Sequence, residues 1–122
     1  MSHDFALKQI GIIMLGVREL EPAIAFYRGR LGLPLQNQFP GFAFFGAGGV
    51  MLVLSEALAQ AHGPAGGAVE VVFSVDHVRP AYEALRAQGV EFHQEPRIVN
   101  GPMWAANFRD PDGHELSVFG PE

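Results

Sequence analysis

An internal repeat limits the fold of this chain more than any other feature of its sequence. Two offsets, 58 and 64 positions, bring similar residues of the two halves into alignment. The aligned pairs are Val17 and Val75, Leu20 and Val78, Pro22 and Pro80, and Ala23 and Ala81 at the first offset, and Gly49 and Gly113, Leu52 and Leu116, and Leu54 and Val118 at the second. Repetition at this period predicts two copies of one supersecondary unit.

Each copy of the repeat has the same predicted order of elements. A buried strand comes first, an amphipathic helix follows, and three short strands separated by Gly and Pro turns complete the unit. Asp76 is the expected N-cap of the second helix. The predicted strands cover 8–17, 33–38, 41–46, 49–55, 68–75, 91–98, 102–108 and 114–119, and the predicted helices cover 19–31 and 76–88.

These elements predict an α+β fold with two tandem βαβββ modules, 5–56 and 68–120. Residues 57–67 are small and Gly-rich, so we expect them to form a flexible connector. One helix cannot cover both faces of a four-stranded sheet. We therefore expect a curved, cup-shaped mixed sheet with the helices outside and a concave face left for a ligand. The whole chain, 1–122, is expected to be a single domain.

Charge and composition exclude several classes of function. The formal net charge is −5 and the eight Lys and Arg residues are scattered, which argues against binding to nucleic acid. The chain has no cysteine, so disulfides and thiolate chemistry are excluded. No apolar run approaches the roughly 20 residues of a membrane helix. The first residues lack the pattern of a signal peptide, so a cytoplasmic location is expected.

Four stretches of the sequence resemble the vicinal oxygen chelate superfamily, which includes glyoxalases, extradiol dioxygenases and bleomycin-resistance proteins. They are IIMLGV at 12–17, RELEPAIAFYRGRLGL at 18–33, FSVDHVRPAYEALRAQGVEF at 73–92 and FRDPDGHELSVF at 108–119. The resemblance covers nearly the whole chain. It implies the same two-module fold, and it implies a homodimer because members often pair to complete their cups.

The resemblance also implies four positions that hold a divalent metal in metal-using members. In this chain those positions carry Ile12, Val53, Glu70 and Ser117. Only Glu70 is a good ligand, whereas hard cations need about six oxygens and zinc about four donors. We therefore expect a member whose metal site has degenerated, with no metal and no other cofactor.

The stretch DPDG at 110–113 predicts a tight turn. Asp suits its first and third positions, Pro its second, and Gly tolerates positive φ. In the strand that follows, alternation places Leu116 and Val118 on the helix-packed face and Glu115 and Ser117 on the cup face. The turn is thus expected to shape the entry of a strand rather than to bind calcium.

Glu70 is the main candidate for chemistry, because its register places a carboxylate in an apolar cup. It could act as a general base or as a hydrogen-bond anchor for a ligand. It could equally be an exposed glutamate near a strand end, or pair with Arg97 or Arg109. Glu115 has the same two interpretations, as a site residue or as a solvated residue on the rim.

Aromatic and apolar residues on the middle strands suggest a pocket for a planar or hydrophobic molecule, although large aromatics also dominate ordinary cores. Alternation allows only one of Phe44 and Phe45 to face the cup. The expected ligand-binding residues are Ile12, Met14, Phe42, Phe44, Val53, Glu70, Trp104, Glu115 and Ser117.

The sequence thus favours a small-molecule-binding protein with a metal-free cup, as in bleomycin-resistance proteins. The alternative is a glyoxalase-like lyase or isomerase, or a dioxygenase-related enzyme. Such an enzyme would use Glu70 as its base, or would hold a divalent metal through Glu70, Glu115 and a further residue. A third possibility is a non-catalytic module for dimerisation or for binding a partner.

Overall fold

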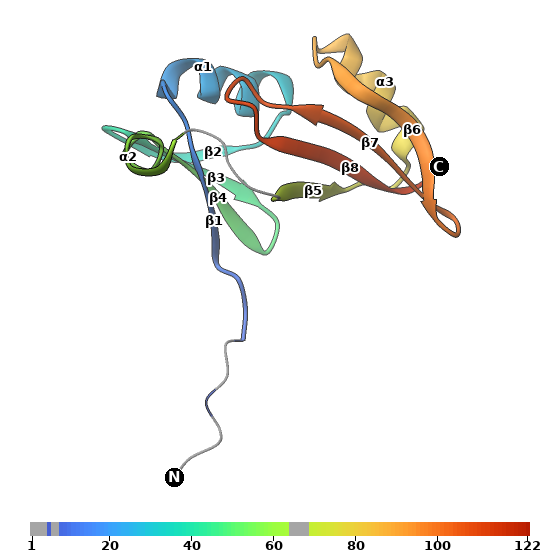
Figure 1. Cartoon of the computed structure of the whole chain (residues 1–122), viewed down its shortest axis with the longest axis horizontal. Helices are drawn as coiled ribbons and strands as arrows, with labels where there is room; N and C mark the ends of the chain where they lie inside the picture. The colour runs from blue at the N-terminus through green and yellow to red at the C-terminus, as the bar shows by residue number, and fades with distance from the viewer. Residues whose placement is uncertain (1–4, 6–7, 64–68) are drawn as a thin grey trace.

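The computed structural model describes residue 5 and residues 8–63 and 69–122. Its strands belong to two separate sheets, one from each half of the chain (Figure 1). Sheet 1 consists of β1 (Ile12–Gly16), β2 (Leu35–Phe39), β3 (Phe42–Ala47) and β4 (Val50–Ser55), and sheet 2 consists of β5 (Glu70–Ser74), β6 (Phe92–Asn100), β7 (Met103–Arg109) and β8 (Glu115–Pro121).

The two sheets have the same topology. The strand order is β1-β4-β3-β2 in sheet 1 and β5-β8-β7-β6 in sheet 2. In each sheet the first strand runs parallel to the last, and the other neighbours are antiparallel. The predicted fold class is confirmed: the protein is α+β, with two βαβββ modules that each form a four-stranded mixed sheet.

The first module's helix changes its winding along its length. The segment α1 (Leu20–Ile24) continues directly into a π-helical segment, η1 (Ala25–Arg30). The widened turn is seen where the N–H of Leu31 donates to the carbonyl of Phe26, five residues earlier. In the described part of the chain, no helix is long and apolar enough to cross a bilayer.

The second module's helix, α3 (Val78–Ala87), begins later than the sequence predicted. His77 occupies its N-cap position, and no side chain caps the helix there, so the expectation that Asp76 is the N-cap is wrong. The first turn of the helix is instead stabilised by Glu122, whose backbone carbonyl accepts a hydrogen bond from the N–H of Arg79. Sequence preference for Asp at an N-cap cannot anticipate a partner so distant in sequence.

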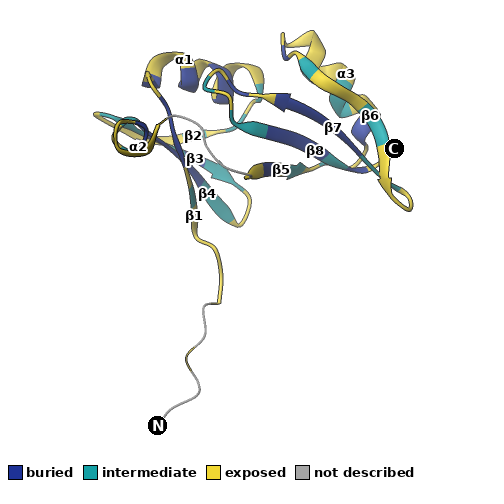
Figure 2. Ribbon diagram, viewed as in Figure 1, coloured by how far each residue is buried: buried dark blue, intermediate teal, exposed yellow. Residues whose placement is uncertain are grey.

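Each sheet buries one face against the helices and leaves the other face without a helix along most of its length (Figures 1 and 2). We call the second face the open face. The helix-packed faces form one core cluster that draws on both modules. Its members on the strands are Leu15, Ala43, Phe45, Leu52 and Leu54 from sheet 1, and Val71, Ala106, Phe108, Leu116 and Val118 from sheet 2.

The DPDG turn joins the second module to the first. The N–H of Gly113 donates to the carbonyl of Asp110, as expected for a tight turn. The Tyr27 hydroxyl donates to Asp110 Oδ2 at 2.8 Å, and both side chains are buried. Arg18 donates to Asp112 Oδ1 from its backbone at 2.9 Å and from Nε at 3.1 Å. The turn therefore anchors one module to the other in addition to starting β8.

The predicted connector over 57–67 is partly wrong, because its beginning is helical. The helix α2 (Glu56–His62) starts where the Ser55 hydroxyl accepts a hydrogen bond from the N–H of Leu58 at 3.0 Å. Its alanine-rich sequence favours a helix, and it packs so closely on β1 that a Cβ on Gly16 would lie 2.9 Å from the backbone nitrogen of Ala59. Residues 64–67 of the expected connector lie outside the described residues.

Candidate functional site

The open face of sheet 1 carries large apolar side chains that the described part of the chain leaves exposed. Ile12 and Met14 on β1 are 51% and 41% exposed, and Phe39 on β2 is 51% exposed. Phe44 on β3 meets Phe39 edge to face, with ring centroids 5.9 Å apart. Phe42 is half-buried beside them and pairs with Phe39 across the two strands. The sequence placed Ile12, Met14, Phe42 and Phe44 together, and the structure brings them to this face.

Alternation assigns Phe45 to the core, where its side chain is completely buried. Val53 and Ser117 lie in the open-face rows of β4 and β8, since they pair with Met14 and Val72 respectively. Their side chains are nevertheless 0% and 1% exposed. Both side chains are covered by neighbouring side chains and present no surface to a ligand. The expectation that Val53 and Ser117 contact a ligand therefore differs from the structure.

Trp104 does not lie on the open face, so its predicted position is wrong. Trp104 pairs with Ile98 on β6 and with Gly120 on β8. Side chains alternate along β7, so this row points to the opposite side of the sheet from Asn107, which lies on the open face. Its ring packs against the core beside α3, with the Arg79 guanidinium 5.4 Å from the ring centroid. The sequence indicated an aromatic residue on a middle strand, but it did not determine which face of the sheet the side chain would occupy.

The open face of sheet 2 is polar and is organised around Asn107 on β7. The Asn107 side chain is only 5% exposed. Its Nδ2 donates to Glu115 Oε2 at 2.8 Å and to Glu70 Oε2 at 3.3 Å. Its Oδ1 accepts a hydrogen bond from Arg97 Nη1 at 3.0 Å. One amide group therefore links a cation on one side to two carboxylates on the other.

Glu115 is the better neutralised of the two carboxylates. His93 Nε2 lies 2.7 Å from its Oε2, and Arg109 Nε lies 3.2 Å from its Oε1. Burial by itself would raise the pKa of Glu115, but the hydrogen bonds from Asn107 and His93 and the nearby charges outweigh it and hold the pKa below its usual range. Glu115 is thus charged and paired, not a solvated residue on the rim.

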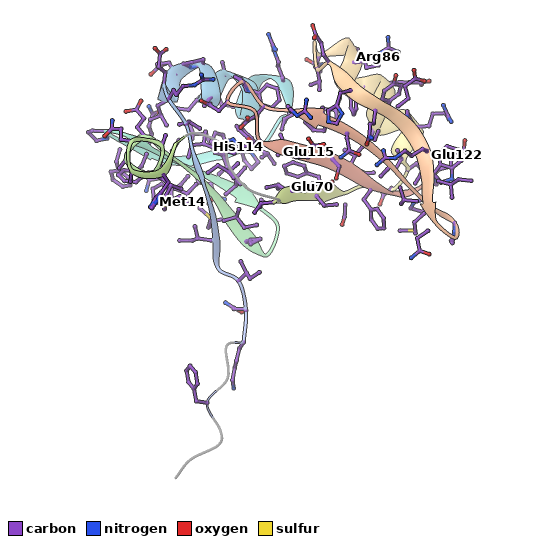
Figure 3. The ribbon with its side chains drawn as sticks, viewed as in Figure 1. Met14, Glu70, Arg86, His114, Glu115 and Glu122 are labelled. Atoms are coloured by element: carbon purple, nitrogen blue, oxygen red, sulfur yellow. The ribbon has the colours of Figure 1, made fainter. Side chains whose placement is uncertain are left out.

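Glu70 lies beside Glu115, from the neighbouring strand β5, as Figure 3 shows. Glu70 is exposed, and among the described residues its one hydrogen bond is the long one from Asn107. Within the described residues no Lys, Arg or His forms an ion pair with it. Glu70 is therefore held in place by an amide but remains available to a ligand.

The donor set at the family's metal positions does not fit a divalent cation. Ile12 and Val53 have no donor atom, and the Ser117 hydroxyl lies on a buried floor. Among the residues that the structure describes, no group of three or more His, Cys, Asp or Glu side chains is arranged to hold a metal ion. A lone carboxylate at Glu70 cannot supply the coordination that such an ion needs.

The site residues expected from the sequence did not include Asn107 or Arg97, although Arg97 was a possible partner of Glu70. A signal was present, because Asn107 interrupts the apolar run MWAANF of a central strand. A buried amide needs partners for both ends of its side chain. That requirement indicates a polar network, but it does not say which side chains complete it.

Comparison with known proteins places these features in a family. A model of the Glyoxalase/Bleomycin resistance protein/Dioxygenase superfamily matches residues 9–118. Among curated proteins, the sequence search finds no significant match. Similar solved structures include a glyoxalase/bleomycin resistance protein/dioxygenase from Nocardioides, which is 28% identical with a TM-score of 0.81 over 98% of this chain and 87% of that one.

Two further structures show how varied the proteins of this fold are. A lactoylglutathione lyase from Agrobacterium tumefaciens is 25% identical, with a TM-score of 0.77 over 93% of this chain and 94% of that one. TnmS3, an antibiotic-binding protein from a Streptomyces species, shares the fold at 21% identity, with a TM-score of 0.79 over 97% of this chain and 99% of that one. By its matching residues and its two-module fold, this chain belongs to the Glyoxalase/Bleomycin resistance protein/Dioxygenase superfamily.

Proposed function

We propose that this protein binds a small apolar or aromatic molecule on its open faces and does so without a metal. The observation that carries the proposal is the exposure of Ile12, Met14 and Phe39 on a sheet face that the helices leave uncovered. Clustered exposed apolar side chains mark a binding surface. The edge-to-face pair of Phe39 and Phe44 leaves ring surface on which a planar ligand can stack.

The family supports this use of the fold. TnmS3, which has the same architecture, is described as an antibiotic-binding protein. The poor fit of a divalent cation to the positions of Ile12, Val53, Glu70 and Ser117 also favours binding over metal-dependent turnover. The open face of sheet 1 is apolar and that of sheet 2 is polar, so a site that draws on both would suit a molecule with a flat apolar body and a polar end.

We also propose that a second copy of the chain completes the site. β1 and β5 are edge strands, each paired on one side only. Both carry exposed apolar side chains on the open face, namely Ile12 and Met14 on β1 and Val72 on β5. Edge strands with exposed apolar side chains are surfaces that pair with another chain. Sedimentation should therefore detect a dimer, which Val72→Glu should weaken.

Titration with 1-naphthol, followed by calorimetry, tests the proposed function. Phe44→Ala should weaken binding by about tenfold, or roughly 1.4 kcal/mol, because it removes a stacking surface. Ile98→Ala is the matched control, since Ile98 is 64% exposed but pairs with Trp104, off the open face. Equal effects of the two substitutions, or no binding to the unchanged protein, would contradict the proposal.

The enzymatic alternative depends on Glu70. Asn107 holds its carboxylate in a defined place, which a general base requires. A base also needs partial desolvation, and in the single chain Glu70 is exposed, so a second copy would have to cover it. In a screen of aldehyde–thiol adducts and other substrates with an acidic C–H, turnover that disappears in Glu70→Gln while binding persists would favour the enzyme.

A further inference from the structure

Arg97 is a half-buried cation that lacks a counter-ion in the part of the chain that the structure describes. Its Nη1 donates to Asn107 Oδ1 and, at 3.3 Å, to the backbone carbonyl of Ala105. Arg18, Arg79 and Arg109 each pair with a carboxylate among the described residues. Arg97 does not, and unlike Arg28, Arg30 and Arg86, which also lack such a partner there, it is half-buried and not exposed. A guanidinium has five N–H donors, so most of those of Arg97 are left for another acceptor.

Glu70 is the corresponding negative group on the same face of sheet 2. It is a carboxylate with one long amide hydrogen bond and no ion pair among the described residues. Glu115 lies beside it, but Arg109 already forms an ion pair with that carboxylate and His93 Nε2 lies within hydrogen-bond distance of it. The open face of sheet 2 therefore carries one uncompensated positive group, at Arg97, and one uncompensated negative group, at Glu70.

Asn107 keeps these two groups apart. Its carbonyl oxygen can only accept a hydrogen bond, and its amino group can only donate. The carbonyl end must therefore face Arg97, and the amino end must face the carboxylates, since the reverse orientation would oppose donor to donor and acceptor to acceptor. The buried Asn107 side chain therefore lies between Arg97 and Glu70 in the hydrogen-bond network, and it holds each of them by its own end of the amide.

We propose that Arg97 and Glu70 form a recognition pair for a zwitterionic head group, with the ligand's carboxylate on Arg97 and its ammonium group on Glu70. This inference rests on the proposed function, because the ligand's aromatic body would occupy the apolar surface. On the open face of sheet 2 itself, Val72 offers apolar surface beside the pair, since it is half-exposed and lies in the same cross-strand row as Asn107. The ligand class is thus an aromatic molecule with an amino-acid-like polar end.

Four probes with the same phenyl ring test the proposal by nuclear magnetic resonance titration of the intact protein. They are L-phenylalanine, 3-phenylpropanoate, 2-phenylethylamine and benzyl alcohol. The zwitterion should bind about tenfold more tightly than the amine, which cannot use Arg97, because a hydrogen bond to a charged group contributes that much. It should bind about threefold more tightly than the carboxylate, which cannot use the more exposed Glu70.

Variants assign the preference to the two residues. Arg97→Gln should lower the affinity for L-phenylalanine to that for 2-phenylethylamine, and Glu70→Gln should lower it to that for 3-phenylpropanoate. Arg86→Gln and Glu83→Gln are the matched controls, because both residues are exposed on α3 behind the sheet, and they should preserve the ranking. If Arg97→Gln fails to fold, the ranking of probes on the unchanged protein still decides.

The outcomes separate the two proposals. If benzyl alcohol binds but L-phenylalanine binds no better than the singly charged probes, the recognition pair is refuted and aromatic binding stands. If L-phenylalanine is preferred but both variants retain the preference, the assignment to Arg97 and Glu70 is likewise refuted. If none of the four probes binds although 1-naphthol does, the recognition pair is refuted and aromatic binding stands; if 1-naphthol also fails to bind, both proposals are overturned.

Discussion

Replacing Tyr27 with Phe removes the hydroxyl that links the first module's helix to the second module's turn. The hydroxyl donates to Asp110 Oδ2 at 2.8 Å, Tyr27 is 0% exposed and Asp110 is 5% exposed. A hydrogen bond to a charged acceptor contributes about 1.5–3 kcal/mol. Asp110 keeps donors from His114 Nδ1 and from the N–H groups of Asp112 and His114. The loss should therefore be about 2 kcal/mol in the free energy of unfolding.

Urea denaturation at pH 7 measures this loss, and a domain of this size should also melt roughly 8 °C lower. Tyr82→Phe is the matched control. The Tyr82 ring meets Phe92 edge to face, and its hydroxyl has no hydrogen bond among the described residues, so removal of that hydroxyl should cost little. A loss below about 0.5 kcal/mol for Tyr27→Phe, or an equal loss for the control, would refute the view that this contact joins the modules.

The same site predicts a dependence on pH. Burial alone would raise the pKa of Asp110, but hydrogen bonds from His114 and Tyr27 outweigh it, so the pKa is lowered in the folded protein. The stabilisation by this charge is therefore present above the unfolded value, about pH 4, and is lost as the pH falls through the folded value. The destabilisation caused by Asp110→Asn should shrink in acid; a penalty that stays constant to pH 3 would refute the assignment.

Three further substitutions or treatments test other parts of the account. Gly16→Ala should destabilise the protein by about 1–3 kcal/mol in urea denaturation, because its Cβ would meet the α2 backbone, whereas Gly11→Ala, with nothing within 4 Å, should not. Arg18→Ala should cost no more than about 1 kcal/mol, because its side chain is 65% exposed in the pair with Asp112. An excess of EDTA should leave the melting temperature unchanged; a decrease would show a stabilising bound metal.

The repeat in the sequence predicted the two-module fold because it reflects packing that both halves must satisfy. Apolar residues at alternating positions specified the buried faces of β1 and β8, and Ile12 and Met14 were correctly separated from Leu15. The DPDG turn was also predictable, since its residue types determine backbone geometry locally. These features depend on interactions near in sequence or on simple periodicity.

Other features depended on partners that the sequence does not identify. Trp104 was placed on the wrong face because aromatic residues suit either side of a strand, and β6 and β7 shift register between Gln94 and Arg97. The helix α2 was missed because its capping residue, Ser55, also ends a strand. The Asn107 network was missed because three of its members, Arg97, Glu70 and Glu115, come from three different strands.

The most direct test of aromatic binding without a metal is a map of amide and methyl chemical shifts on the labelled protein during titration with 1-naphthol, with and without excess EDTA. We expect shifts at Met14, Phe44 and Val72 that are the same in both series. Shifts confined to the surface of α3, or binding that disappears with the chelator, would contradict the account.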